Sequence, residues 1–420
     1  MGDRKDHPMC HSHLGQPAVW ALISLLAVSG VGQSTWGPQH LERAKALHAR
    51  AIVLDTHSDV TPKFHNADWD FAARHDSGHM DIPRMRDAGF DAQFLSVYMG
   101  RKPDPGTAIK EAIRRVDAVY ETVRKHPTQL EIAYTAADVV RIKKAGKIAC
   151  LMGIEGGHII EDSLAALRML HRLGCRYMTL THSFNSVWAD SSGTMSDVKG
   201  DFDGLSERGQ ELISEMNRIG IMVDISHVAD ATFWDAIQLT KAPVIASHSS
   251  VDGVFPHRRN LSDPMLRAVK KNNGVVMINF FSAYIDPDFD GYQKAWDAEH
   301  KEALDAMRTK FKANRREFRS AQREFMKTHP MKQTPLTVLA RHVEYCAKVA
   351  GWDHVGMGAD WDGVSALPEG IKHCGDTVKL TALLLARGAN EDDLEKFLGK
   401  NLLRVMADCE KSAREMTAGN

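Results

Sequence analysis

The chain has 420 residues, of which 43% are hydrophobic and 25% charged, and its formal net charge is −1. These values are typical of a soluble globular protein, and the near-neutral balance excludes the basic surface expected of a nucleic-acid-binding protein. The 21 histidines exceed what packing alone requires, an excess that is consistent with metal chemistry.

The N-terminal segment has the pattern of a secretory signal peptide. Arg4 and Lys5 precede an apolar stretch over residues 18–32, and small residues follow it. We predict that residues 1–32 form a signal peptide, cleaved around residues 29–33, and that the protein is exported to the periplasm or secreted. The alternative is an uncleaved leader that anchors the chain, because the stretch approaches the length of a membrane-spanning helix.

From about residue 50, short apolar runs alternate with amphipathic stretches. The apolar runs cover residues 51–54, 92–99, 148–154, 177–180, 221–225, 244–246, 275–280 and 355–358. Helical spacing of apolar residues occurs between them, as at residues 162–173, 207–219, 231–238 and 337–350. Continuous apolar strands alternating with helices indicate a parallel sheet covered on both faces. Eight such units predict an α/β fold of the (β/α)8 TIM-barrel type. No glycine-rich phosphate-binding motif follows any strand, which argues against a nucleotide-binding sheet.

Polar residues follow six of these runs at the point where each strand should end. They are His57, Asp59, Glu155, His182, His227, His248, Asp360 and Asp362. The carboxyl ends of barrel strands converge, and active sites of this fold form there. A lone histidine at a strand end is more often structural, but four histidines with several carboxylates at matching positions predict one shared site.

Imidazole and carboxylate ligands without thiolate suit zinc, and also manganese, iron or cobalt. The candidates are too numerous for one ion that also keeps a position open for water. A bridging carboxylate solves this, and Glu155 is the natural bridge because Gly156 and Gly157 let the backbone come close. One ion would take His57 and Asp59, and the other would take His227 and His248. Two ions could hold a bridging hydroxide as the nucleophile.

The remaining polar residues keep alternative roles at this point. His182 could polarise the scissile carbonyl, and Asp360 could carry a proton from the water to the leaving amine, but either could be a further ligand. Arg258 and Arg259 follow His248, and one of them could bind a substrate carboxylate; the other interpretation is a solvated pair.

The six cysteines show no metal-binding spacing. Cys10 lies in the leader, and the other five are Cys150, Cys175, Cys346, Cys374 and Cys409. This pattern excludes a zinc ribbon and makes a disulfide framework unexpected, although one disulfide remains open. Cys150, in an apolar run, is predicted to be buried.

Eight segments of the chain resemble the membrane dipeptidase (renal dipeptidase) family of the metal-dependent hydrolase superfamily. They read DTHSD, HMDIPRMRDAGFDAQFLSVY, GIEGGH, YMTLTHSFNSVWADSS, MVDISH, PVIASHSS, HRRN and GADWDGV, in family order from about residue 50 to 406. The resemblance implies a barrel with two Zn²⁺ ions per chain that hydrolyses dipeptides, including those with a C-terminal D-residue.

The same resemblance implies a role for each matching residue. His57, Asp59 and Glu155 resemble the ligands of one zinc ion, with Glu155 shared, and His227 and His248 those of the other. His182 resembles the residue that binds substrate and steadies the tetrahedral intermediate, Arg259 the clamp on the C-terminal carboxylate, and Asp360 the proton-shuttling acid.

The chain departs from the family pattern in two places. Residues 286–330, after the seventh strand, are longer and more charged than expected, and we predict a solvated helical hairpin, with a lid or an oligomer contact as the alternative. The terminal residues KSAREMTAGN carry no hydrophobic tail, so no lipid anchor is predicted. The expected organisation is a single catalytic domain over residues 40–410 that includes the insertion.

Other functions fit parts of the pattern. One alternative is another metal-dependent amidohydrolase acting on N-acyl amino acids or lactams. A second is an exported binding protein without turnover, although every chemical group needed for hydrolysis is present. The sequence leaves open whether the protein forms a homodimer.

Overall fold

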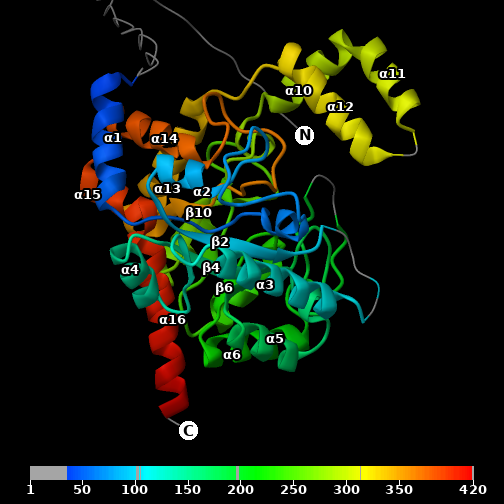
Figure 1. Cartoon of the computed structure of the whole chain (residues 1–420). Coiled ribbons are helices and arrows are strands. Elements are labelled where there is room, and N and C mark those ends of the chain that lie inside the picture. Colours follow the sequence, from blue (N-terminus) through cyan, green and yellow to red (C-terminus); the bar gives the residue numbers. More distant parts are fainter. Residues whose placement is uncertain (1–35, 101–103, 105, 195–197, 313, 419–420) are drawn as a thin grey trace, which may run out of the picture. The chain divides into compact units, whose positions relative to one another are not determined.

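The computed structural model describes residues 36–100, 104, 106–194, 198–312 and 314–418 (Figure 1). The predicted signal peptide, including Cys10, lies outside these residues. The described residues group into one compact unit by their contacts. Within the described residues, no helix combines the length and the apolarity needed to span a bilayer.

Eight parallel strands pair in chain order to form the barrel. They are β1 (Val53–Asp55), β2 (Phe90–Tyr98), β4 (Ile148–Glu155), β5 (Cys175–Thr179), β6 (Met222–Asp224), β7 (Ile245–Ala246), β10 (Val275–Ile278) and β11 (Val355–Met357). The first and last strands meet through the backbone: Thr56 N–H donates to the Met357 carbonyl at 3.2 Å, and Ser58 forms a parallel bridge with Trp361. The predicted (β/α)8 barrel is confirmed, because each of the eight apolar runs overlaps one of these strands.

Three short strands were not expected. β3 (Leu130–Ile132) pairs in parallel with the first residues of β4, and β8 (Ser250–Val251) pairs with β9 (Asn260–Leu261) after β7. None of the three lies in a continuous apolar run of the kind that predicted the barrel strands.

Helices cover the outer face of the sheet. The described helices outside the insertion are α1 (Pro38–Arg50), α2 (Ile82–Asp87), α3 (Ala108–Lys125), α4 (Ala136–Lys144), α5 (Leu164–Arg172), α6 (Glu207–Ile219), α7 (Asp230–Leu239), α8 (Asp263–Lys271), α9 (Ser282–Ile285), α13 (Leu336–Ala350), α14 (Thr377–Ala386), α15 (Glu391–Glu395) and α16 (Asn401–Ala418). The predicted helix at residues 207–219 coincides with α6. Its ends have clear causes: the Ser206 hydroxyl accepts from Gly209 N–H, and Gly220 ends the helix at φ 80°.

Alternate residues of each strand enter two separate apolar clusters. Leu54, Phe94, Leu151 and Met222 are among those of the barrel interior, whereas neighbours such as Val53 and Cys150 pack outward against helices. Burial on both faces explains why the strands read as continuous apolar runs. Cys150 and the other four described cysteines are buried and free, so no disulfide forms among them.

The charged insertion after β10 forms three helices rather than the expected hairpin of two. They are α10 (Phe289–Glu299), α11 (Lys301–Lys310) and α12 (Arg315–Thr328), which project from the barrel in Figure 1. Trp296 joins α10 to the end of α12, because its Nε1–H donates to the His329 carbonyl at 2.7 Å. Phe325 stacks on the His329 ring at 4.0 Å between centroids.

Candidate active site

Two barrel strands end in the same local turn, and each turn presents a site histidine. Asp55 accepts a hydrogen bond from His57 N–H two residues later, and Asp224 accepts one from Ser226 N–H, just before His227. A side-chain carboxylate that caps its own backbone in this way stops the strand and fixes the direction of the next residues. Asp55 also accepts from Ala359 N–H at 2.7 Å, which ties the end of β1 to the end of β11.

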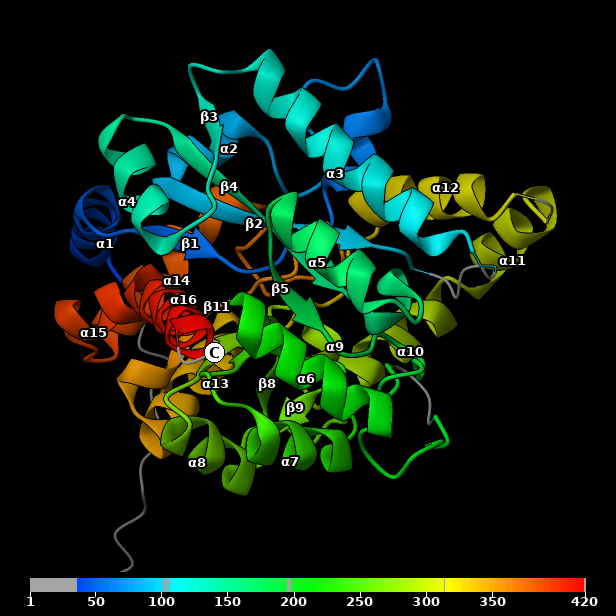
Figure 2. The same ribbon diagram turned by 90° about the horizontal axis from the view of Figure 1, so that it is seen from below.

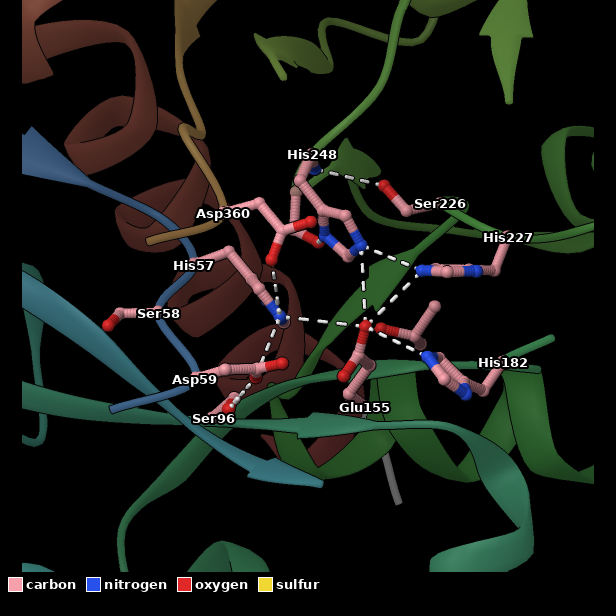
Figure 3. Close-up of polar contacts among 12 residues, drawn as sticks. His57, Ser58, Asp59, Ser96, Glu155, His182, Ser226, His227, His248 and Asp360 are labelled. Carbon is pink, nitrogen blue, oxygen red and sulfur yellow. Dashed lines mark hydrogen bonds and ion pairs between the residues drawn. The ribbon is translucent and has the colours of Figure 1, made fainter. Parts of the chain in front are cut away.

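Glu155, the last residue of β4, lies at the centre of the predicted site (Figure 3). Its Oε1 lies 3.2 Å from Nε2 of His227, 3.4 Å from Nε2 of His248, and 3.5 Å from Nε2 of both His57 and His182. The chain turns sharply after Glu155, and both residues of the turn must be glycine. Gly156 has φ 106°, which other residues rarely adopt, and a Cβ at Gly157 would lie only 2.5 Å from the Leu180 carbonyl. One carboxylate oxygen therefore faces four imidazoles from four strand ends.

Two further carboxylates complete the group on the side of His57. Its Nε2 lies 3.5 Å from Oδ1 of Asp59 and 4.0 Å from Oδ1 of Asp360. Ser96 of β2 donates a hydrogen bond to Asp59, and Asn279 donates to Asp360 at 3.3 Å. The predicted His57–Asp59 pair does share a direction, as the spacing of two residues indicated.

His248 is held in one tautomer by residues that the sequence did not single out. The Ser247 hydroxyl donates to Oδ2 of Asp224 at 2.6 Å, so its oxygen accepts from Nδ1–H of His248 at 2.8 Å. The proton of His248 is therefore on Nδ1, and the lone pair on Nε2 points to Glu155. A partner of this kind on the outer ring nitrogen is typical of metal-binding histidines.

His57 is fixed in the same way by Tyr177. The Tyr177 hydroxyl donates to the Thr56 carbonyl at 3.1 Å and accepts from Nδ1–H of His57 at 2.7 Å. Tyr177 reaches this position from β5 across the barrel interior, where Gly153 makes room: a Cβ there would lie 2.0 Å from the tyrosine ring. Nothing in the spacing of the sequence indicates this contact.

Two buried polar atoms at the centre, Nε2 of His57 and Oε2 of Glu155, have no hydrogen-bond partner among the described residues. The outer Nδ1 atoms of His182 and His227, whose Nε2 atoms face Glu155, also have none among these residues. The Nε2 atoms of His227 and His248 lie 2.8 Å apart, although neither is held as a donor by another residue. Buried polar atoms without partners are rare in folded proteins, and the convergence of four Nε2 atoms on one carboxylate oxygen fits a bound cation.

Burial and neighbouring charges set the ionisation of the site. Burial, with Arg259 adding to it at His227 and His57 at His248, holds the pKa of these two histidines well below the usual value. They are therefore neutral, the form that binds a metal ion. Although burial opposes ionisation, the imidazoles around Glu155 hold its pKa well below the usual value.

Asp360 has the opposite behaviour. Burial raises the pKa of its carboxyl to about 7, and the nearby carboxylates of Asp59 and Glu155 add to this effect, while His57 and Arg259 oppose it. A carboxyl with a pKa near neutrality can both accept and release a proton at pH 7.

Three groups of side chains have ligand atoms close enough to share an ion. They are His57–Glu155–His248, Glu155–His182–His227 and His57–Asp59–Asp360. Glu155 belongs to two of them and His57 to two. These groupings differ from the predicted split, because they place His248 with His57 and bring in both His182 and Asp360. Asp362 is in none of them: it turns away, pairing with Lys63 at 2.7 Å.

The two adjacent arginines lie in different environments. Arg259 is 3% exposed, and it donates to the His248 carbonyl at 3.1 Å and to the Ser249 hydroxyl at 3.3 Å. Its Nε has no partner among the described residues. Arg258 is exposed, and its Nη1 contacts the Ser192 carbonyl at 3.4 Å. Of the two, Arg259 is the one that is buried against the backbone of His248.

The model of the family described as "Membrane dipeptidase (Peptidase family M19)" matches residues 41–420. The chain belongs to this family. The "probable dipeptidase PvdM" from Pseudomonas aeruginosa is 25% identical, and the match covers 89% of this chain and 99% of that one with a TM-score of 0.76. The metallo-peptidase named dipeptidase AC is also 25% identical, over 86% of this chain and 98% of that one, with a TM-score of 0.69.

A third relative carries a ligand. It is a metallo-peptidase from Rhodobacter sphaeroides bound to a phosphinate mimic of the dipeptide L-Ala-D-Ala, 25% identical over 86% of this chain and 99% of that one, with a TM-score of 0.69. The chain is thus a metal-dependent dipeptidase with the TIM-type barrel of its family, and these predictions are confirmed.

Proposed function

We propose that this dipeptidase binds two Zn²⁺ ions, one held by His57, Asp59 and Glu155 and the other by Glu155, His227 and His248. The observation that carries the proposal is the position of Glu155, whose Oε1 lies within 3.2–3.5 Å of four imidazole nitrogens. Nitrogen and carboxylate ligands without thiolate favour zinc among the common ions. When bound, the ions supply an activated water and polarise the scissile carbonyl.

His182 and Asp360 are assigned to substrate and proton transfer rather than to ligation. Their side chains are 16% and 13% exposed, more than those of the proposed ligands, of which Asp59 is 10% and the three histidines are 0–5% exposed. The two residues therefore face the space that substrate must enter. His182 donates a hydrogen bond to the oxyanion that develops on the scissile carbonyl, and Asp360 takes the proton of the attacking water and passes it to the leaving amine.

Arg259 binds the C-terminal carboxylate of the dipeptide. A buried guanidinium that contacts only neutral groups among the described residues favours an anionic ligand, since burial without a counter-charge is costly. The relative bound to a mimic of L-Ala-D-Ala supports acceptance of a D-residue at that position. The leader at residues 1–32 supports export of the enzyme.

A panel of L,L and L,D dipeptides tests the reaction, with metal content measured by elemental analysis. We expect turnover that a chelator abolishes and zinc restores, with two ions per active chain. No turnover of any dipeptide by zinc-loaded protein would contradict the proposed reaction, and full activity with one ion would contradict the binuclear site.

The adjacent arginines separate a dipeptidase from an amidohydrolase that ignores the carboxylate. Arg259→Ala should raise KM for dipeptides about 100-fold or more, and much less for the corresponding dipeptide amides. Arg258→Ala is the matched control and should leave both values within about twofold. Equal effects of the two substitutions would remove the assignment of the clamp.

A further inference from the structure

A second cavity lies on the face of the barrel opposite the active site. Its volume is about 570 Å³, and its lining includes Tyr134, Arg176, Arg218, Glu410 and Arg414. Arg176 is near the start of β5, Tyr134 precedes α4, and the last turns of α16 form one wall. Figure 2 shows α16 nearly end-on beside α6, and the ends of both helices contribute to the cavity lining. These segments are at the amino ends of the strands, so the length of the barrel separates the cavity from Glu155 and its neighbours.

Arg176 carries a partly buried charge without an acidic partner among the described residues. Its Nε donates to the Tyr134 carbonyl at 2.5 Å, and its Nη1 donates to the carbonyls of His171 and Cys175 at 2.7 and 2.8 Å. Nη2 has no hydrogen bond to any residue that the structure describes. The guanidinium is thus held rigidly by neutral oxygens while one of its donors stays free.

No acidic group of the cavity forms an ion pair with Arg176 among the described residues. Glu410, the one acidic residue of the lining, acts on Arg176 only at longer range, and its carboxylate accepts from Ala136 N–H at the start of α4 at 2.9 Å. Arg218 pairs with Glu215, which Arg168 also shares. Arg414, exposed at the rim, has no ion pair within the described part of the chain.

An aromatic wall completes the cavity. The Tyr134 side chain is 37% exposed, and the Arg176 guanidinium lies over its ring at 5.5 Å. The Tyr134 hydroxyl bonds to that of Tyr120 at 2.8 Å, and Tyr120 in turn donates to the Leu173 carbonyl at 2.9 Å. The ring is therefore fixed, and together with Ile219 it gives the cavity an apolar side next to its cationic one.

We propose that this cavity is a second ligand site, which binds a small molecule through a tetrahedral oxyanion, such as a phosphate or sulfate group. Arg176 and Arg414 contact the oxyanion, and Tyr134 and Ile219 contact the organic part. The volume is in the range of sites for small molecules, roughly 300–1,000 Å³. Guanidinium groups suit a tetrahedral oxyanion because each presents several N–H donors in a fixed geometry. The site does not depend on the proposed zinc centre.

Inorganic sulfate is the first probe, titrated calorimetrically into the metal-loaded enzyme at constant ionic strength, with phosphate and acetate as further arms. We expect sulfate and phosphate to bind, acetate to bind at least about tenfold more weakly, and sulfate to slow amide hydrogen exchange at residues 410–418 and 216–220. Equal binding of acetate would overturn the preference for a tetrahedral oxyanion, and unchanged exchange at both segments would overturn the location.

Arg414→Glu tests the cavity without destabilising the protein, because the side chain is exposed. We expect sulfate affinity to fall about tenfold or more and dipeptide hydrolysis to remain within twofold. Arg319→Glu, on exposed α12, makes the same charge change elsewhere and should leave sulfate affinity unchanged. Arg176→Gln should abolish the binding, but it also removes bonds to three carbonyls, so Arg414 decides the result. An equal loss of sulfate affinity in the Arg414 and Arg319 variants would show that only the net charge of the protein matters, and would overturn the proposal.

Discussion

The active site and the α10–α12 insertion are both rich in charged residues, but they hold these charges in opposite ways. At the strand ends, Glu155 is 3% exposed and one of its oxygens has no hydrogen-bond partner among the described residues. In the insertion, Asp290 and Lys294 pair across one helical turn with side chains 73% and 75% exposed. An exposed ion pair changes the free energy of folding little. A buried charge is stable only where neighbouring groups or a ligand compensate for its loss of hydration. The difference teaches that a cluster of buried ionisable groups with unpartnered atoms, rather than the number of charges, marks the functional region.

Glu155→Gln should give the largest effect, because it removes the charge that four imidazoles face while keeping the shape of the side chain. We expect kcat/KM for a dipeptide to fall at least about 1,000-fold, since the shared metal ligand is lost. Metal analysis of the purified variant should show fewer than two ions per chain. A variant that keeps both ions and activity within tenfold of wild type would show that Glu155 is not the bridge.

A single type of substitution, glycine to alanine, contrasts the two regions directly. At Gly363, a Cβ would lie 2.0 Å from Oδ1 of Asp360 and 2.9 Å from Oδ2 of Asp59, so both carboxylates must move. We expect kcat to fall about 100-fold, the effect of a displacement of about 1 Å at a catalytic group, with little loss of stability because Gly363 is exposed.

The matched change in the insertion is Gly291→Ala. A Cβ at Gly291, within α10, would meet no atom within 4 Å. It should therefore raise the free energy of unfolding of this segment by about 0.5–1 kcal/mol, because alanine is the better helix former, without affecting kcat. Similar activities for the Gly363 and Gly291 variants would contradict the contrast.

Tyr177→Phe tests how far the site depends on its tautomers. The change keeps the ring that fills the barrel interior but removes the acceptor of Nδ1–H of His57. Zinc affinity, measured by competition with a chromophoric chelator, should fall about 10–100-fold. Tyr120→Phe is the control. It also removes a hydrogen-bonded tyrosine hydroxyl, but this hydroxyl contacts Tyr134 rather than a residue of the site, so zinc affinity should be unchanged. Equal zinc affinities in the Tyr177 variant and the wild type would show that the hydroxyl does not position His57.

The sequence was sufficient to predict those features of the site that arise from single strands. The spacing of two residues predicted that His57 and Asp59 would face the same group, although both lie beyond the end of β1, and the convergence of strand ends follows from the barrel. Tyr177 was missed because its hydroxyl meets His57 from 120 residues away, across the interior. A buried polar residue inside an apolar run, such as Asp224 in MVDIS, is the one local signal that could have pointed to such partners.

Local pattern also could not distinguish neighbours that face opposite ways. Arg258 and Arg259 are adjacent residues of the same type, and the sequence does not distinguish them. The fold shows that Arg259 is the one buried beside His248. Asp362 resembled Asp360 as a strand-end carboxylate, yet it pairs with Lys63. Positive φ values at both aspartates, 63° and 65°, turn the chain between them in a way that period-two alternation does not describe.

The smallest effect is expected from an exposed ion pair of the insertion, and its smallness is informative. Lys294→Ala removes the partner of Asp290 on the surface of α10, where water already solvates both groups. The free energy of unfolding, measured by urea denaturation, should change by no more than about 0.5 kcal/mol, and less at high salt. If the change instead exceeded about 2 kcal/mol, the charges of the insertion would be structural in the same sense as those of the site, because exposed pairs of this kind rarely contribute so much. The burial of the charge would then no longer separate the two regions, and the assignment of function to the strand ends would depend on the geometry of Glu155 alone.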